Sequence, residues 1–366
     1  MQLVAYGAQD IYLTGNPQIT FFKVVYRRHT NFAMEAIAQT FDGQVSSGCT
    51  VSATISRNGD LVHRVYLEVD NSNDVMNAFA LVDQVDLEIG GQLIDRHYGK
   101  WMAVWCELTH STSKHEQLDM LIDADKGTLG DDNDAGAQNR VWIPLQFSFC
   151  RNPGLAIPLI ALQYHEVKIN VKFGTLPANA NVCMWCDYIY LDTDERRRFA
   201  QTSHEYLIEQ VQSSLSNCTT PGCVQKVTLH FNHPVKELVW MEDNGSWASN
   251  SRGLWTTDKP NTNMLLRLNG HERFTARDSS YFSKVQRYQH HTGAHAVPLP
   301  DTGVKHNHLF VYSFALQPEE HQPSGTCNFS RIDNAVLELT GDCDIYAVNY
   351  NVLRVMSGMG GLAYSN

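Results

Sequence analysis

The sequence lacks the excess of basic residues that proteins coating nucleic acid carry. Its 366 residues include 28 Lys and Arg against 39 Asp and Glu, and the formal net charge is −11. Binding to phosphates depends on clustered Lys and Arg, so we expect no direct binding of nucleic acid. The local basic clusters are Lys23 with Arg27 and Arg28, and residues 196–198. We interpret both as surface ion pairs or contacts that stabilise a joint.

Long apolar runs are missing as well. No stretch approaches the roughly 20 apolar residues that a membrane-spanning helix needs. Residues 1–10 show no basic segment followed by an apolar one, which is the pattern of a signal peptide. These features predict a protein without a transmembrane segment or leader, made and used in a cytosol-like space.

A disulfide framework is also absent. The nine cysteines are odd in number and irregularly spaced, which is typical of a reducing compartment. Cys183-x-x-Cys186, together with Cys218 and Cys223, has the residue types of a zinc site. However, residues 183–190 read as a buried strand, on which positions three apart face opposite sides. We therefore predict no metal and no cofactor.

Helical periodicity is scarce, and period-2 alternation dominates. Apolar and polar residues alternate, as in half-buried strands, over residues 65–69, 167–173, 227–231 and 335–339. The few helical candidates are residues 97–122, 194–198 and 278–289. Many short strands with few helices predict an all-β protein made of sandwiches, with a few short helices in loops.

The chain also looks internally doubled. Residues 87–91 are echoed by residues 266–270, and each segment precedes one of the longer helical candidates. Residues 147–149 are also echoed by residues 312–314, and each segment leads through a Pro-containing loop to an alternating strand. The copies are separated by about half the chain, as expected if each half is one domain.

These echoes predict an N-terminal arm over residues 1–22 and two domains over residues 23–195 and 196–366. The charged segment 191–199 is the predicted junction, either a stiff joint or an ordinary surface turn. For the arm two interpretations remain open. It reaches a neighbouring molecule or the layer beneath an assembly, or it lies on its own domain.

Six segments distributed over the whole chain carry a resemblance to a known family. They are Gly15-Asn16-Pro17-Gln18-Ile19-Thr20-Phe21-Phe22-Lys23, Ser56-Arg57-Asn58-Gly59-Asp60-Leu61, Arg151-Asn152-Pro153-Gly154-Leu155-Ala156, Asp192-Thr193-Asp194-Glu195-Arg196-Arg197-Arg198-Phe199, Ser324-Gly325-Thr326-Cys327-Asn328-Phe329-Ser330-Arg331-Ile332-Asp333 and Tyr350-Asn351-Val352-Leu353-Arg354. In this order they resemble the major capsid proteins of nucleocytoplasmic large DNA viruses, including the phycodnaviruses and giant viruses.

The resemblance implies two tandem jelly-roll β-sandwiches, a homotrimer of pseudo-hexameric outline, and an icosahedral shell around double-stranded DNA. It also implies a structural protein without catalytic residues, located in the virion and assembled in host cytoplasm, with minor capsid proteins as partners beneath the shell. The chain looks shorter than most family members, and the candidate shortened loops are residues 123–140 and 290–305. Short loops there predict a lower, smoother outer crown.

A metal-dependent enzyme of the cupin type is the first alternative. Cupins are jelly rolls that use a His-x-His pair, which His306 and His308 supply here. The next acids, Glu319 and Glu320, follow too late for that pattern. We interpret these histidines as a solvated loop, together with His290, His291 and His295.

A carbohydrate-binding β-sandwich is the second alternative, with Trp247 and Trp255 in the loop 244–261 as its aromatic platform. Indole rings in a loop usually pack somewhere, and packing within their own domain is the simpler expectation. Asn217, Asn244 and Asn328 begin Asn-x-Ser/Thr sequons, which we interpret as chance matches in a protein assembled in the cytosol.

Overall fold

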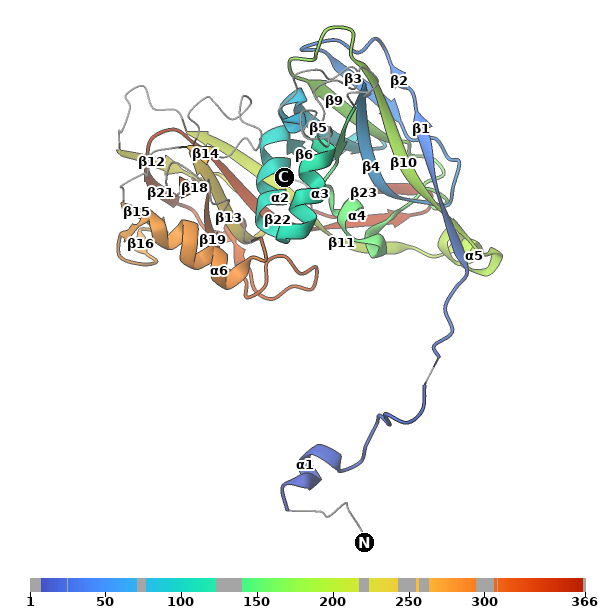
Figure 1. The fold of residues 1–366 in the computed structure, drawn as a ribbon, viewed down its shortest axis with the longest axis horizontal. Helices are drawn as coiled ribbons and strands as arrows, with labels where there is room; N and C mark the ends of the chain where they lie inside the picture. Colours follow the sequence, from blue (N-terminus) through green and yellow to red (C-terminus); the bar gives the residue numbers. More distant parts are fainter. Residues whose placement is uncertain are drawn as a thin grey trace, which may run out of the picture.

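The computed structural model describes residues 8–24, 26–70, 77–122, 140–216, 224–242, 255–256, 263–293, 306–307 and 309–364. The strands form two pairs of sheets, one pair in each half of the chain (Figure 1). The predicted all-β architecture of two tandem jelly rolls is confirmed.

The first jelly roll is built from two antiparallel sheets. One contains, in spatial order, β1 (Phe32–Gln39), β10 (Asn181–Leu191), β4 (Leu61–Asp70) and β7 (Val141–Pro144), with β8 (Ile157–Pro158) also pairing with β4. The other contains β2 (Phe41–Asp42), β3 (Thr50–Thr54), β9 (Val167–Phe173), β5 (Val82–Ile89) and β6 (Gln92–Tyr98).

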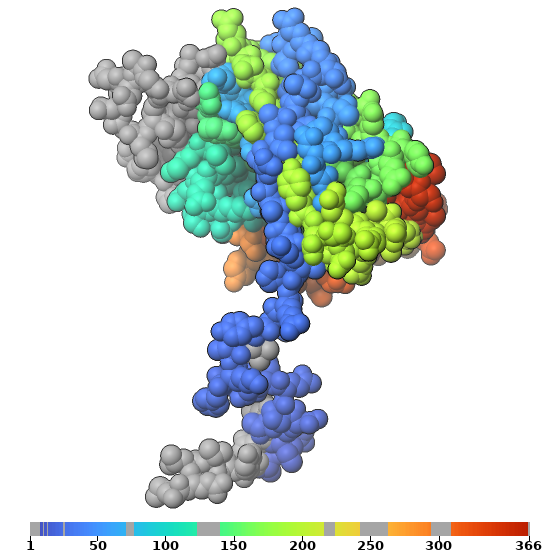
Figure 2. Space-filling model, turned by 90° about the vertical axis from the view of Figure 1, so that its right-hand side faces the viewer, coloured from blue at the N-terminus to red at the C-terminus, as the bar shows by residue number. Residues whose placement is uncertain are grey.

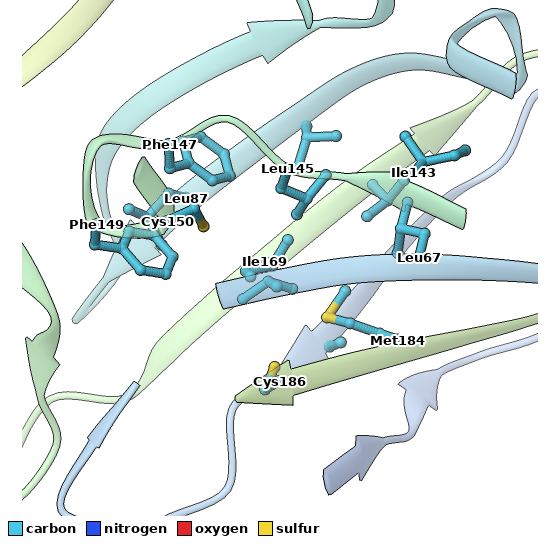
Figure 3. Packing of buried hydrophobic residues seen from close by; sticks show 14 of the residues in the cluster. Leu67, Leu87, Ile143, Leu145, Phe147, Phe149, Cys150, Ile169, Met184 and Cys186 are labelled. Atoms are coloured by element: carbon cyan, nitrogen blue, oxygen red, sulfur yellow. The ribbon is translucent and has the colours of Figure 1, made fainter. Parts of the chain in front are cut away.

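The core of the first jelly roll lies between these sheets. Strand β9 alternates between buried and more exposed residues, as its sequence predicts. Leu67 and Met184 from one sheet and Leu87 and Ile169 from the other belong to one buried cluster (Figure 3). Period-2 alternation therefore places one face of each sheet in the core.

The second jelly roll repeats this construction. One sheet contains β11 (His204–Ser216), β22 (Cys343–Met356), β13 (Pro234–Glu242) and β19 (Leu309–Ser313), with β20 (Cys327–Asn328) on β13 and β23 (Met359–Leu362) on β22. The other contains β12 (Val224–Thr228), β21 (Ala335–Thr340), β15 (Asn263–Leu268) and β16 (His271–Glu272), with β17 (Arg277–Asp278) on β15. Strands β14 (Trp255–Thr256) and β18 (His306–Asn307) form a separate pair.

The two jelly rolls share one strand order. Eight main strands make up each jelly roll. In chain order they are β1, β3, β4, β5, β6, β7, β9 and β10 in the first, and β11, β12, β13, β15, β16, β19, β21 and β22 in the second. Numbered 1 to 8 in this order, they form sheets with the orders 1-8-3-6 and 2-7-4-5 in both halves. The echoed segments 87–91 and 266–270 form equivalent hairpins between the fourth and fifth strands, β5–β6 and β15–β16. Gly90 and Gly270 both have positive φ there, as tight turns require.

Each helical candidate forms helix, with breaks that the sequence did not predict. Residues 97–122 give two helices, α2 (Gly99–Thr109) and α3 (Thr112–Ile122). Residues 194–198 lie in α5 (Thr193–Gln201), and residues 278–289 give the π-helical turn η4 (Tyr281–Val285) followed by α6 (Gln286–His290).

The remaining helical segments are single turns. They are α1 (Asp10–Thr14), η1 (Ala78–Leu81), α4 (Ser148–Arg151), η2 (Pro153–Leu155) and η5 (Phe329–Arg331). None of the helices in the described ranges is long and apolar enough to cross a bilayer.

Candidate functional site: the joint between the jelly rolls, and the surfaces left exposed

Helix α2 joins the two jelly rolls and is buried on nearly all sides. It follows the fifth strand of the first jelly roll and stands between the two jelly rolls in Figure 1. Met102 and Cys106 belong to the core of the first jelly roll. Gly99 begins the helix against η1, where a Cβ would clash with the carbonyl oxygens of Phe79 and Val82. Glycine therefore lets the helix lie this close to its own domain.

The opposite side of α2 packs on the second jelly roll. Its residues Trp101, Val104, Trp105 and Leu108 share a buried cluster with residues of β11, β13, β19 and β22, namely Val211, Val239, Met241, Leu309, Val311, Tyr346 and Val348. Exposing a large apolar side chain costs roughly 1.5–3 kcal/mol. Opening the joint at α2 would expose several such side chains, so this apolar cluster strongly disfavours hinge motion between the jelly rolls.

Strand β13 carries a sequence signal for this packing. Leu238 and Trp240 face the core of the second jelly roll, while Val239 and Met241 face α2. Residues 238–241 are thus an uninterrupted apolar run, in contrast to the alternating strand over residues 167–173. Such a run marks a strand covered on both faces, and it could have predicted that this sheet is covered by another part of the protein.

Buried charges lie beside α2. The Nζ of Lys236, which is fully buried, lies 2.8 Å from Oε1 of Glu209, and Arg151 of the first jelly roll lies 3.1 Å from Oε2 of the same carboxylate. The Arg151 guanidinium also stacks over the Trp105 ring at 4.3 Å. Burial alone would raise the pKa of Glu209, but Arg151 and Lys236 outweigh it and lower that pKa. The carboxylate stays charged and ties the two halves together.

His291 is a second buried charge, and here the solvated-loop interpretation was wrong. Its side chain is fully buried, with Nε2 3.0 Å from Glu237 and Nδ1 2.9 Å from Glu319. Burial lowers the pKa of His291, but the two carboxylates outweigh burial and raise it to about 9. Glu319 is therefore part of an ion-paired cluster. The members of this cluster come from a strand and two separate loops, so no local sequence motif reveals that they meet.

Polar contacts at the rim also connect the two halves. Lys100 of α2 lies 2.8 Å from Asp344 of β22, and Arg287 of α6 lies 3.3 Å from Glu107 of α2. The backbone N–H of Gly293 donates to the carbonyl of Leu108 at 2.7 Å. Together with the apolar cluster, these contacts hold the jelly rolls at one fixed angle.

The junction 191–199 is helical rather than a bare turn. The Asp192 side chain accepts a hydrogen bond from Thr193 N at the start of α5. Arg196 lies 2.9 Å from Asp60, whose other oxygen accepts from Leu191 N at 2.8 Å. Phe199 stacks on His204 with ring centroids 5.1 Å apart. These contacts favour the stiff-joint interpretation, and the basic run contributes an ion pair through Arg196, as predicted.

The N-terminal arm extends away from the body of the molecule (Figure 2). Its large apolar side chains are strongly exposed, reaching 92% for Phe21 and 98% for Phe22. Ile19 of the arm is also exposed, as are Val24 and Tyr26 directly after it. Exposed apolar residues gathered in one segment mark an interaction site. This arrangement agrees with the interpretation that the arm reaches another molecule, and not with an arm lying on its own domain.

The outer face of the sheet β1-β10-β4-β7 is the second exposed surface. A hollow of about 610 Å³ lies there, lined by Phe32, Met34, His63, Arg64, Pro153, Gly154, Asp187, Ile189 and Leu191. Phe32 and Met34 are 57% and 49% exposed, although they sit on a strand. Burial raises the pKa of Asp187 in this hollow, against the effect of Arg64. The exposed lining of the hollow is mostly apolar.

The predicted absence of a zinc site rests on strand geometry that the structure reproduces. Cys183 is partly exposed, and Cys186 lies in the core on the other face of β10, where burial raises the pKa of its thiol. Cys218 and Cys223 lie outside the described residues. No group of three or more potential metal ligands occurs within the described ranges.

Several other candidates lie wholly or partly outside the described residues. They are His295, His308, Trp247, Asn217 and Asn244, the loop 123–139 and most of the loop 290–305; of His306 and Trp255 only the strand assignment is described. Asn328 is exposed, and its side chain accepts a hydrogen bond from Ser330 N at 3.1 Å.

Comparison with known proteins gives the family. A family model described as the major capsid protein N-terminus matches residues 20–192, and one described as the large eukaryotic DNA virus major capsid protein matches residues 195–361. This chain belongs to the major capsid proteins of large eukaryotic DNA viruses. The resemblance inferred from the six sequence segments is confirmed.

Known capsid proteins resemble the chain over its whole length. It is 51% identical to the major capsid protein of Pyramimonas orientalis virus and 42% identical to that of Paramecium bursaria Chlorella virus 1, over 100% of this chain and 99% of each relative. The chain in the PBCV-1 virus capsid matches with a TM-score of 0.82 and 38% identity, over 95% of this chain and 100% of that one. The Faustovirus major capsid protein shares the fold, with a TM-score of 0.72 and 12% identity, over 96% and 95% of the two chains.

Membership in this family sets the class of function. The protein is a structural component of a viral capsid shell and not an enzyme, so the cupin-type and carbohydrate-binding alternatives find no support among its relatives. The alignments run over 403 and 446 positions, more than the 366 residues of the chain. These relatives therefore carry additional residues, in keeping with the predicted shortening of loops.

Proposed function

We propose that the protein assembles as a homotrimeric capsomer with a pseudo-hexameric outline, and that these capsomers tile an icosahedral shell around double-stranded DNA. One observation carries the proposal. Two jelly rolls of the same strand order are locked side by side by the buried helix α2. Three such pairs around a threefold axis present six similar lobes, and closed symmetry stops the assembly at three copies.

The rigidity of the joint supports this role. A lobe that swung freely would not present a constant angle to its neighbours, and a regular shell needs identical building blocks. The apolar cluster around Trp105 and the buried Glu209–Lys236 pair both oppose such motion. The domain division follows as part of the proposal, with an arm over residues 1–22 and jelly rolls over residues 23–195 and 196–366.

The exposed arm supports a role beneath or between capsomers. Its aromatic residues, led by Phe21 and Phe22, suit an apolar groove on a minor capsid protein or a neighbouring capsomer. The net charge of −11 argues against direct binding of the genome. Assembly in the host cytoplasm agrees with cysteines that are all free among the described residues.

The test is the oligomeric state and outline of the purified protein. Native mass spectrometry should give a trimer, and negative-stain microscopy should give particles with a hexagonal outline. A stable monomer at high protein concentration would overturn the trimer, and lobes at variable angles in the images would overturn the rigid joint.

A further inference from the structure

The segment η4–α6 is the counterpart of α2 in the second jelly roll. Both follow the fifth strand and precede the sixth strand of their own jelly roll. In α2, Met102 and Cys106 are buried in the core of their own domain. In the second jelly roll, Phe282 and Gln286 are buried with the same spacing of four residues. The two helical segments are therefore seated on their own domains through equivalent positions, although Tyr281 packs on its own core where its counterpart Trp101 faces the other jelly roll.

This alignment identifies the outer face of η4–α6. Trp105 and Leu108, which α2 presents to the second jelly roll, correspond to Val285 and Tyr288. Val285 is 41% exposed and Tyr288 is 90% exposed. The structure thus holds one helix whose outer face is covered and an equivalent helix whose apolar outer face is bare. Tyrosine is enriched among the few residues that contribute most of the binding energy in protein interfaces.

The receiving surfaces show the same contrast. Helix α2 covers the outer face of β11-β22-β13-β19 in the second jelly roll. The equivalent sheet of the first jelly roll, β1-β10-β4-β7, has on its outer face the hollow lined by Phe32, Met34, Ile189 and Leu191. A single chain therefore carries one helix with exposed Val285 and Tyr288 and one sheet face with exposed Phe32 and Met34. These surfaces correspond to the two halves of its own internal joint.

We propose that the outer face of η4–α6, formed by Lys284, Val285 and Tyr288, docks into this hollow on a second copy of the chain. The inference rests on the proposed capsomer and specifies its contact. Helix and sheet face are different surfaces, so the contact is heterologous, and rotation by one third of a turn closes it into a ring. Contacts within and between chains then alternate around the ring and resemble one another.

Charge supports the same pairing. Lys284 is exposed beside the apolar residues of the helix, at the position equivalent to Val104 of α2. Burial raises the pKa of Asp187 in the hollow. An ammonium group brought near would favour the charged carboxylate. In the internal joint a lysine of α2 also meets a carboxylate, since Lys100 lies 2.8 Å from Asp344, but one turn earlier on the helix.

The competing candidate for the hollow is the N-terminal arm, which leads directly into Phe32 of the lining. An arm folded back would place Phe21 or Phe22 in the hollow of its own chain. The helix is favoured because the hollow lies on the sheet face equivalent to the one that α2 covers. Cross-linking separates the two occupants.

The first experiment is disulfide cross-linking of the full-length protein, with exposed Cys49 replaced by serine. Met34→Cys combined with Tyr288→Cys should give covalent dimers and trimers on mild oxidation with copper phenanthroline. The control combines Met34→Cys with Val224→Cys, since Val224 is 75% exposed but lies on the opposite sheet of the second jelly roll. Efficient cross-linking of Met34→Cys to Phe22→Cys within one chain, in place of the helix, would overturn the proposal.

The second experiment is Tyr288→Asp, followed by sedimentation. Because Tyr288 is nearly fully exposed in the single chain, circular dichroism should stay unchanged. The dissociation constant of the trimer should rise about 30-fold or more, as for a central aromatic anchor. A trimer unaffected by Tyr288→Asp and without the helix–hollow cross-link would overturn this contact while leaving the proposed capsomer intact. A wild-type protein that is monomeric at high concentration would overturn both.

Discussion

The outer faces of two equivalent sheets differ sharply in this protein. In the second jelly roll, Val239, Met241, Tyr346 and Val348 are buried against α2. In the first, Met34 is half-exposed and lines an open hollow. The strand order is the same in both. The comparison teaches that the fold itself needs only the inner faces, and that the outer faces decide which lobe meets which neighbour.

The same contrast recurs at an irregularity that both sheets share. The third and eighth strands shift register in each jelly roll, between Cys186 and Tyr188 in one and between Val235 and Glu237 in the other. At the shift in the second jelly roll, Lys236 is buried and paired with Glu209. At the shift in the first, Arg64 is exposed beside the hollow. The same register shift therefore lies in the closed joint of the second jelly roll and on the open surface of the first.

Truncating the central residue of the joint should have the largest effect. Trp105→Ala should lower the free energy of unfolding by about 4 kcal/mol, because it leaves a cavity against the second jelly roll. Trp185→Ala, on the outer face of the first jelly roll, should cost less than about 2 kcal/mol, because Trp185 is only partly buried. Urea unfolding at one protein concentration measures both. Equal losses of unfolding free energy in Trp105→Ala and Trp185→Ala would contradict the difference between the two outer faces.

Removing the buried carboxylate should come next. Glu209→Gln should cost about 3 kcal/mol, because Lys236 and Arg151 would remain buried without their charge partner. Adding Lys236→Met should recover part of the loss, which a double-mutant cycle measures. Asp187→Asn in the hollow should cost less than about 1 kcal/mol, since burial already disfavours its charged form. A larger loss at Asp187 than at Glu209 would contradict this account.

The pH dependence of stability should carry a contribution from His291. Its folded pKa of about 9 lies above the ordinary value of 6.5, so the folded state binds the proton more tightly than the unfolded state. The contribution is fully present below pH 6.5 and is lost as the pH rises through about 9. Wild-type protein should lose about 3 kcal/mol over this range from this group.

The variant His291→Gln isolates that contribution. It should be less stable at pH 6.5 and show a flatter decline toward pH 9.5, measured by urea unfolding at several pH values. His290→Gln, one residue earlier, is the matched control and should keep the wild-type slope. If the stability of His291→Gln fell with pH as steeply as that of the wild type, deprotonation of His291 would not be the cause of the alkaline loss of stability.

The junction helix should show the smallest effect. Arg196→Gln removes the ion pair between Arg196 and Asp60. The Arg196 side chain is 56% exposed, and exposed ion pairs contribute about 0.2–1 kcal/mol to stability. Arg197→Gln, on the same exposed helix, is the control and should change stability by less than about 0.5 kcal/mol. Small-angle scattering should find the angle between the jelly rolls unchanged in both. A change of angle in Arg196→Gln would mean that α5, rather than α2, holds the joint.

Much of the architecture could be read from local sequence patterns. The alternation over residues 167–173 predicted β9, and the echo of residues 87–91 by 266–270 falls on equivalent hairpins. Helical periodicity over residues 97–122 located α2 and α3 but not the break at His110 between them. Such patterns succeed because the spacing of apolar residues follows from the repeat of the element itself.

The burial of His291 was beyond such reasoning. Its sequence neighbours suggest a polar loop, yet Glu237 of β13 and Glu319 of a later loop enclose its ring. A buried charge is tolerated only where partners arrive from elsewhere in the fold. Sequence spacing cannot say which distant carboxylates will meet, so the solvated-loop prediction failed there.

By itself, the sequence determined two β-sandwich lobes, because alternating apolar residues require a buried face on each strand wherever the chain runs. Only the tertiary structure decided that one lobe's outer face is closed by α2 while the equivalent face stays open. That outcome depends on the angle at which the two folded lobes meet. It brings the ring centroids of Trp101 and Tyr346, which are far apart in the sequence, to 5.1 Å from each other.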